Sequence, residues 1–317
     1  MRIQRSRSDA PPLALADALR VLDAAAQARA TREAPVGRNA KIPWTDSTFN
    51  PWWGCAAVSP GCAHCYAETL GHRFGVEWGP LAPRRFFGPK HWSEPEAWNR
   101  AAEREGRPAF VFCASMCDVF DAHGDARLAE ARERLWGLIG RTPNLVWLLL
   151  TKRPQHVSQF VPAAWRRGCW PVNAWLGVTA EDQRRAGERI PILLSLPAPR
   201  RFVSYEPALG PVDFSALEGA RLDWVVVGGE SGSDARPFDV AWARDTVRQC
   251  RQAGVAAWVK QLGRRPYIIC DVLDHGCVDE RATAYPITDR DGRDLSEWPA
   301  DIRVQERPEP LPMRGAP

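Results

Sequence analysis

The stretch LVWLLLT, residues 145–151, places six apolar residues in a row before a closing threonine. An apolar run of this length without alternation is typical of a β-strand that is buried on both faces, as the strands of parallel sheets are. Similar runs recur along the chain: FVFCASM (110–116), AWLGVT (174–179), RFVSYE (201–206), WVVVGGE (224–230) and AAWVKQ (256–261). This repetition predicts a parallel sheet.

Helix-compatible segments lie between these runs, at residues 126–140, 182–196 and 240–254. Gly254 stands where a helix is expected to end, directly before the last run. Such alternation implies parallel strands joined by crossover helices, and a further strand expected just before the first cysteines brings the count to about seven. The sequence therefore predicts an α/β fold with a partial or complete (β/α) TIM-type barrel. An open doubly wound sheet is the alternative.

Polar residues follow each predicted strand. They are Ser115 and Asp118; Thr151, Lys152 and Arg153; Thr179, Glu181 and Asp182; Tyr205 and Glu206; Gly228, Gly229 and Glu230; and Lys260 and Gln261. In parallel α/β folds the carboxyl ends of the strands meet at one edge, where functional sites assemble. These residues are expected to form one functional face, although turn formation and helix capping, for instance by Asp182, would also explain single members.

The net charge of +4 is concentrated at the amino terminus. Residues 1–41 hold eight basic and four acidic residues, a difference of four, so residues 42–317 are neutral in sum. We therefore expect a basic, partly helical or disordered leader over 1–40, and a single barrel domain over 41–317 with an irregular C-terminal segment. No segment resembles a signal peptide or a membrane span, so a cytoplasmic protein with reduced thiols and no membrane partner is predicted.

Three cysteines, Cys55, Cys62 and Cys65, follow one another with the spacing C-x6-C-x2-C. A structural zinc site would need a fourth ligand, for which His64, Cys113 or Cys117 is available. A redox pair or an incidental grouping are further alternatives. The remaining interpretation is a 4Fe–4S cluster with three thiolate ligands, which leaves one iron open to chelation by S-adenosylmethionine.

Several blocks of the sequence together resemble a known family. They are WTDSTFNPWWGC (44–55), SPGCAHCYAE (59–68), SMCDVF (115–120), LLTKRP (149–154), WLGVTAEDQ (175–183), RFVSYEPALGPVD (201–213), WVVVGGESG (224–232) and DGRDLSEWP (291–299). Over Lys41 to Arg307 the chain is similar to the phage-type three-cysteine-motif family, largely uncharacterised proteins that are regarded as radical-SAM-like. The resemblance implies a radical-SAM-like barrel with Cys55, Cys62 and Cys65 as ligands of the cluster.

The chain departs from ordinary radical-SAM enzymes in two respects. Their cysteine spacing is usually C-x3-C-x2-C, with an aromatic residue where this chain has His64. Their Gly-Gly-Glu element ends the second strand, whereas Gly228, Gly229 and Glu230 end a late strand here. At the second strand, Ser115 and Asp118 occupy the matching place. Our candidate cofactor-binding residues are therefore Ser115, Asp118, Glu181, Gly228, Gly229 and Glu230.

Two further residues are candidates for catalysis. Glu206 could contact a ribose or move a proton, unless it forms an ion pair with Arg153 or Arg236. Lys152, beside Arg153, could bind a phosphate or carboxylate, unless it serves a structural ion pair. The fifteen tryptophans either pack in the core or stack on nucleobases.

The predicted function is that of a radical S-adenosylmethionine-type enzyme with an external electron donor. Its substrate would be a nucleic acid, through repair or modification of a base, or a small molecule. The alternative is a zinc-stabilised, non-catalytic, phage-associated protein that binds nucleic acid.

Overall fold

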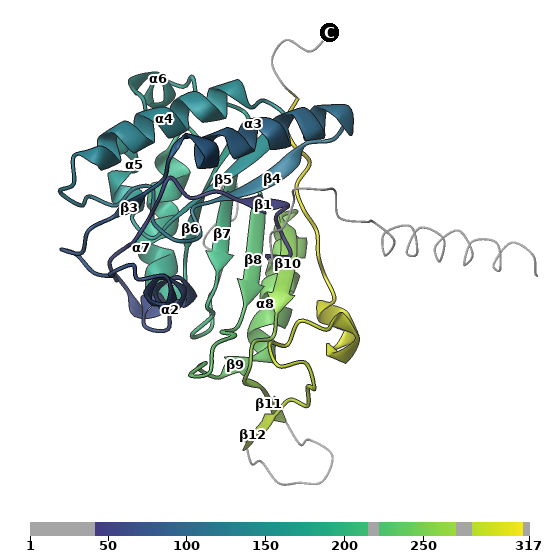
Figure 1. The fold of residues 1–317 in the computed structure, drawn as a ribbon. Coiled ribbons are helices and arrows are strands. Elements are labelled where there is room, and N and C mark those ends of the chain that lie inside the picture. Colours follow the sequence, from purple (N-terminus) through teal and green to yellow (C-terminus); the bar gives the residue numbers. More distant parts are fainter. Residues whose placement is uncertain (1–41, 215–221, 271–280, 313–317) are drawn as a thin grey trace, which may run out of the picture. The chain divides into compact units, whose positions relative to one another are not determined.

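The computed structural model describes residues 42–214, 222–270 and 281–312 (Figure 1). The expected leader, with its helical stretch, lies outside these residues. In the described ranges no helix combines the length and the apolar character that crossing a membrane requires.

Seven strands form one sheet in which all neighbours are parallel, in the order β1–β4–β5–β6–β7–β8–β10. They are β1 (Ser47–Thr48), β4 (Ala109–Cys113), β5 (Leu145–Thr151), β6 (Ala174–Thr179), β7 (Arg201–Tyr205), β8 (Trp224–Gly228) and β10 (Ala256–Gln261). The sheet curls into a half-barrel, and its two edge strands, β1 and β10, do not pair with each other. The predicted partial barrel of about seven strands is confirmed.

The helices alternate with these strands. They are α2 (Tyr66–Arg73), α3 (Pro89–Arg104), α4 (Arg127–Arg141), α5 (Val157–Phe160), α6 (Ala163–Arg166), α7 (Gln183–Ser195) and α8 (Val240–Ala253). Short 3-10 turns are η1 (Pro60–Cys62), η2 (Pro154–His156), η4 (Leu295–Glu297) and η5 (Ala300–Ile302). The three predicted helices correspond to α4, α7 and α8. Asp182 caps α7 by accepting the N–H of Arg185, and Gly254 ends α8 in the left-handed conformation, as expected.

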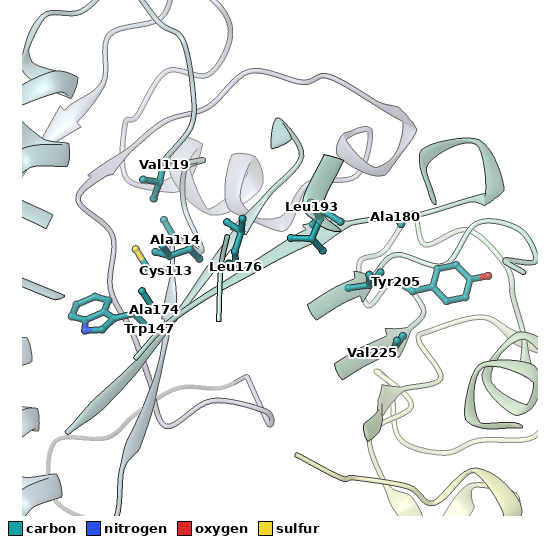
Figure 2. Close-up of a cluster of buried hydrophobic side chains, with 14 of the residues drawn as sticks. Cys113, Ala114, Val119, Trp147, Ala174, Leu176, Ala180, Leu193, Tyr205 and Val225 are labelled. Atoms are coloured by element: carbon teal, nitrogen blue, oxygen red, sulfur yellow. The ribbon is translucent and has the colours of Figure 1, made fainter. Parts of the chain in front are cut away.

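Side chains alternate between the two faces of the sheet. Leu145, Trp147 and Leu149 of β5 belong to the core between sheet and helices, part of which Figure 2 shows. Val146 and Leu148 of the same strand belong to a second cluster on the opposite face. That second cluster is dominated by aromatic rings: Trp44, Phe110, Phe112, Trp175, Phe202, Trp224 and Trp258. It fills the inner face of the half-barrel with side chains, as barrel interiors require.

Two smaller sheets and the C-terminal segment complete the fold. β2 (Trp52–Trp53) pairs with β3 (Arg85–Phe86), and β11 (Pro266–Cys270) lies between β9 (Phe238–Asp239) and β12 (Arg281–Ala284). Beyond β12 the chain returns to the edge strand β10, where the N–H of Val259 donates to the carbonyl of Val304. The C-terminal segment thus covers a strand edge that would otherwise be unpaired.

The inner face makes one prediction about stability. Gly177 lies in β6, and a Cβ there would stand 2.4 Å from the ring of Phe202, which is fully buried. We expect Gly177→Ala to force that ring aside and to lower the free energy of unfolding by about 1–3 kcal/mol. Denaturant unfolding measures this change.

Gly187→Ala is the matched control, because a Cβ at this position in α7 meets open space. This variant should gain about 0.5–1 kcal/mol, since alanine suits a helix interior better than glycine. A Gly177→Ala variant as stable as the wild type would contradict the packing described for the inner face.

Candidate functional site

A cavity of about 370 Å³ opens at the carboxyl ends of the strands. Its wall includes all three cysteines of the C-x6-C-x2-C motif, Cys55, Cys62 and Cys65. Its floor includes Trp44 and Phe112 of the inner aromatic cluster. Residues from the strand ends also line it: Ser115, Cys117 and Asp118; Leu150, Thr151, Lys152 and Arg153; Thr179; Ser204 and Glu206; and Lys260 and Gln261. Polar residues from several strand ends therefore share one cavity.

The cysteine loop, residues 54–65, is held across the strand ends by contacts that are distant in sequence. The N–H of Gly54 donates to the carbonyl of Met116 after β4, at 3.1 Å. The N–H of Gly61 donates to the carboxylate of Glu181 after β6, also at 3.1 Å. A Cβ at Gly61 would lie 3.1 Å from that carboxylate, which explains why glycine stands there.

Glu181 is itself fixed by its surroundings. It is fully buried and forms an ion pair of 2.8 Å with Arg189, which is also buried. Burial alone would raise the pKa of Glu181, but hydrogen bonding and the charge of Arg189 outweigh it and hold the pKa below its usual value. Glu181 is therefore charged at neutral pH and holds the loop as an acceptor.

Glu230 forms a second attachment. Its carboxylate is paired with Arg236 and lies 3.0 Å from Nδ1 of His64, inside the cysteine loop. Arg236 also donates to the carbonyl of Pro60, at 3.0 Å. Burial would raise the pKa of Glu230, but hydrogen bonds from Arg236 and His64 keep it low. The Gly-Gly-Glu element therefore contacts the cysteine loop itself.

Cys55 lies against a buried charge pair. Nη1 of Arg153 is 3.6 Å from Sγ of Cys55 and 3.0 Å from a carboxylate oxygen of Asp118. Burial, reinforced by the charge of Asp118 and opposed by that of Arg153, raises the pKa of the Cys55 thiol to about 11. A metal that binds here would have to displace the thiol proton.

Glu206 faces the cavity in an ion pair with Lys260, whose Nζ lies 2.8 Å from its carboxylate. The alternative that Glu206 pairs with Arg153 or Arg236 is wrong, because Arg153 pairs with Asp118 and Arg236 with Glu230. Lys152 also lines the cavity, and no ion pair to its side chain forms within the part of the chain that the structure describes.

The sequence-based candidates thus fall into two groups. Cys55, Cys62, Cys65, Ser115, Asp118, Lys152 and Glu206 line the cavity. Glu181 and Glu230 contact the cysteine loop but do not line the cavity. Gly228 and Gly229 do not line the cavity either. Sequence reasoning missed Tyr66 and Arg293, which also line the cavity. Tyr66 directly follows the last cysteine and donates to the carbonyl of Ser115, so its position in the motif was a signal.

The donor set can be compared with the two metal hypotheses. In the described ranges no three or more His, Cys, Asp or Glu side chains are grouped so as to hold a metal ion. Tetrahedral zinc requires its ligands to converge on one point at about 2.0–2.3 Å. A cubane cluster binds each thiolate through a different iron, so its ligands stand further apart around a shared space. The three thiols of the motif supply the ligands of a cluster with one open iron, and Cys117, which also lines the cavity, would supply the fourth ligand of a zinc site.

Comparison with known proteins identifies the family. Residues 39–292 match the model of a family described as protein of unknown function (DUF5131), and the chain belongs to this family. No curated protein is similar enough in sequence to match. Among solved structures, a spore photoproduct lyase mutant with bound AdoMet and dinucleoside spore photoproduct is similar, with a TM-score of 0.42 and 14% identity. The match covers 62% of this chain and 59% of that one, less than two thirds of the lyase chain.

The Glu181 attachment predicts a pH dependence of stability. The pKa of Glu181 is lower in the folded protein than in the unfolded chain, where it is about 4.3. The contribution of the Glu181 carboxylate to the free energy of unfolding is therefore complete above the unfolded pKa and is lost as the pH falls through the folded pKa. We expect Glu181→Gln to lower the free energy of unfolding by about 3–5 kcal/mol at pH 7, because Arg189 loses its buried partner. The difference from the wild type should narrow below about pH 4. Denaturant titrations between pH 3 and 7 measure both effects.

Glu188→Gln is the control, since Glu188 lies on α7 next to Arg189, in an exposed pair with Arg184. It should leave stability unchanged. A Glu181→Gln variant with the same deficit at pH 3 and pH 7 would show that the carboxylate charge is not what holds the loop.

Proposed function

We propose that this member of the DUF5131 family is a radical S-adenosylmethionine-type iron–sulfur enzyme of the phage-type three-cysteine-motif group. The single observation that carries the proposal is the placement of Cys55, Cys62 and Cys65 around one cavity at the carboxyl ends of a parallel half-barrel. Chemistry in parallel α/β barrels is performed at this edge. A solely structural metal site has no need of such a cavity.

The three thiols would hold a 4Fe–4S cluster, and the iron without a protein ligand would chelate S-adenosylmethionine. When bound, this pair would supply a 5′-deoxyadenosyl radical, because one electron transferred to the sulfonium breaks its S–C5′ bond and releases methionine. The protein's part is to hold the thiols in place and to position the ligands. The contacts of the cysteine loop with Met116, Glu181 and Glu230 support the first task.

The cavity wall supports the second task. Ser115 and Asp118 lie at the end of β4, beside the thiols, where they would contact S-adenosylmethionine. Glu206, with its partner Lys260, would accept or return a proton of the substrate. The ammonium of Lys152 would bind a carboxylate or phosphate. Glu181, Gly228, Gly229 and Glu230, first considered for cofactor binding, would position the cysteine loop.

The substrate would be a nucleic-acid base or a small molecule of similar size. The cavity volume of about 370 Å³ falls in the range of small-molecule sites. Its aromatic floor offers planar apolar contacts, which bases favour. An external one-electron donor would also be needed, because the proposed cluster must be reduced before it can transfer an electron to the sulfonium.

Oxygen-free reconstitution with iron and sulfide tests the metal centre. We expect the wild type to bind about four irons and four sulfides per chain, from the stoichiometry of the proposed cluster. Single Cys→Ala variants at positions 55, 62 and 65 should lose most of this content. Iron and sulfide analysis, absorbance near 400 nm and EPR after reduction measure it.

Cys169→Ala is the matched control, because Cys169 is exposed and does not line the cavity; it should reconstitute like the wild type. Cys117→Ala tests for a fourth protein ligand, since Cys117 does line the cavity. Stoichiometric zinc without sulfide, lost on changing Cys117, would instead establish the zinc-stabilised binding protein.

The enzymatic part of the proposal predicts a product. Reconstituted protein incubated with S-adenosylmethionine and dithionite should release 5′-deoxyadenosine, detectable by chromatography and mass spectrometry.

Lys152→Met should weaken the binding of its anionic ligand, with about a tenfold or larger loss of turnover, because a charge-assisted hydrogen bond is removed. Fully loaded protein that never cleaves S-adenosylmethionine would refute the radical chemistry and leave the cluster assignment standing.

A further inference from the structure

The three cysteines of the motif differ in their surroundings. Sγ of Cys55 has a guanidinium donor, Nη1 of Arg153, at 3.6 Å. No side-chain or backbone donor forms a hydrogen bond with the sulfur of Cys62 or Cys65 within the part of the chain that the structure describes. One corner of the proposed cluster would therefore carry a charged hydrogen bond that the other two lack.

Arg153 is held firmly for this contact. It is 5% exposed. The same Nη1 donates to Asp118 at 3.0 Å, and Nη2 donates to the carbonyl of Ala56, next to the cysteine, at 2.8 Å. Its backbone N–H donates to the hydroxyl of Thr151, whose own O–H donates to Asp118. Because both ends of the guanidinium are fixed, its position relative to Cys55 is set before any cluster binds.

The charges around Arg153 are unbalanced. Arg153 pairs with Asp118, and Arg84 pairs with Asp121 at 2.7 Å. Arg132, also buried, donates to the backbone carbonyls of Val119 and Asp121. These five side chains, three guanidinium groups and two carboxylates, sum to one positive charge. Within this group Arg153 favours negative charge at the sulfur of Cys55, whereas the charges of Asp118 and Asp121 oppose it.

We propose that Arg153 is a positioning residue that raises the reduction potential of the iron–sulfur cluster through its hydrogen bond to Cys55. The inference rests on the proposed function, because it concerns the same cluster. One-electron reduction adds negative charge to the cluster and its thiolates. Hydrogen bonds to the sulfurs and nearby positive charge stabilise that reduced form, and such contacts set the potentials of iron–sulfur centres.

The test is an EPR-monitored potentiometric titration of the reconstituted full-length protein, with dithionite as reductant. For Arg153→Met we expect a more negative midpoint potential. At a fixed potential the ratio of reduced to oxidised cluster should fall about tenfold, which is 59 mV for one electron. Arg153→Lys keeps the charge without the planar fork and should fall between Arg153→Met and the wild type. An unchanged potential in a fully loaded Arg153→Met variant would overturn the inference.

Arg84→Lys is the matched control, since Arg84 belongs to the same buried group and has no contact with a cysteine sulfur among the hydrogen bonds of the described residues. Its potential should equal that of the wild type. An equal shift in Arg84→Lys and Arg153→Met would overturn the specific role of Arg153. Absence of any cluster in the wild type would be a failure of the proposed function, and would be seen in the iron and sulfide content before a potential is measured.

A second measurement covers the case in which the Arg153 variants lose the cluster. Resonance Raman spectra of the wild type in H₂O and D₂O report hydrogen bonds to the ligating sulfurs. We expect the Fe–S(Cys) stretching bands to shift on deuteration, because the guanidinium protons exchange. Bands that stay fixed after full exchange would show that no N–H···S bond reaches the cluster, and the inference would fail.

Discussion

The buried carboxylate of Glu181 connects the half-barrel to the loop that carries its chemistry. It stands at the carboxyl end of β6, where Arg189 of α7 neutralises it and the N–H of Gly61 binds to it. A charge buried this completely persists only when it is paired and hydrogen-bonded. The interaction therefore fixes where Gly61 lies, and with it the adjacent Cys62. The common cavity of the three thiols depends on this attachment and on its counterpart at Glu230.

The fold was predictable because its signals are local. Six apolar runs mark six of the seven parallel strands, and the pattern of residues 126–140, 182–196 and 240–254 marks the helices that cover them. Other elements carry weak signals. β1 is two residues long, and α3 contains Pro95 and few apolar residues, so neither periodicity nor propensity reveals it. Of the tryptophans near the cysteines, Trp44, Trp52 and Trp92 pack in the core and are at most 5% exposed, whereas Trp53, Trp78 and Trp98 are half-buried.

The site was predictable only in outline. Parallel topology predicts that polar residues gather at the strand ends. It does not predict which of these residues contact one another. Glu181 lies 120 residues from Gly61, and Glu230 lies 166 residues from His64. Pairings over such separations are set by the curvature of the sheet and by loop conformation. The partner of Glu206 was missed for the same reason, because Lys260 belongs to a strand two positions away in the sheet.

The Gly-Gly-Glu element shows why a motif must be assigned by position. In this chain it ends β8, and its glutamate binds Arg236 and His64, so that one carboxylate orders the loop between Cys62 and Cys65. At the same time Arg153 orders the loop beside Cys55. Each attachment is a charge pair: Glu230 with Arg236 near His64, and Arg153 with Asp118 near Cys55. In the first pair the carboxylate meets the loop at His64, and in the second the guanidinium meets Sγ of Cys55, so a cluster held between them would receive a charged hydrogen bond at Cys55. The asymmetry follows from which strand end each charged residue occupies, since Glu230 follows β8 and Arg153 follows β5.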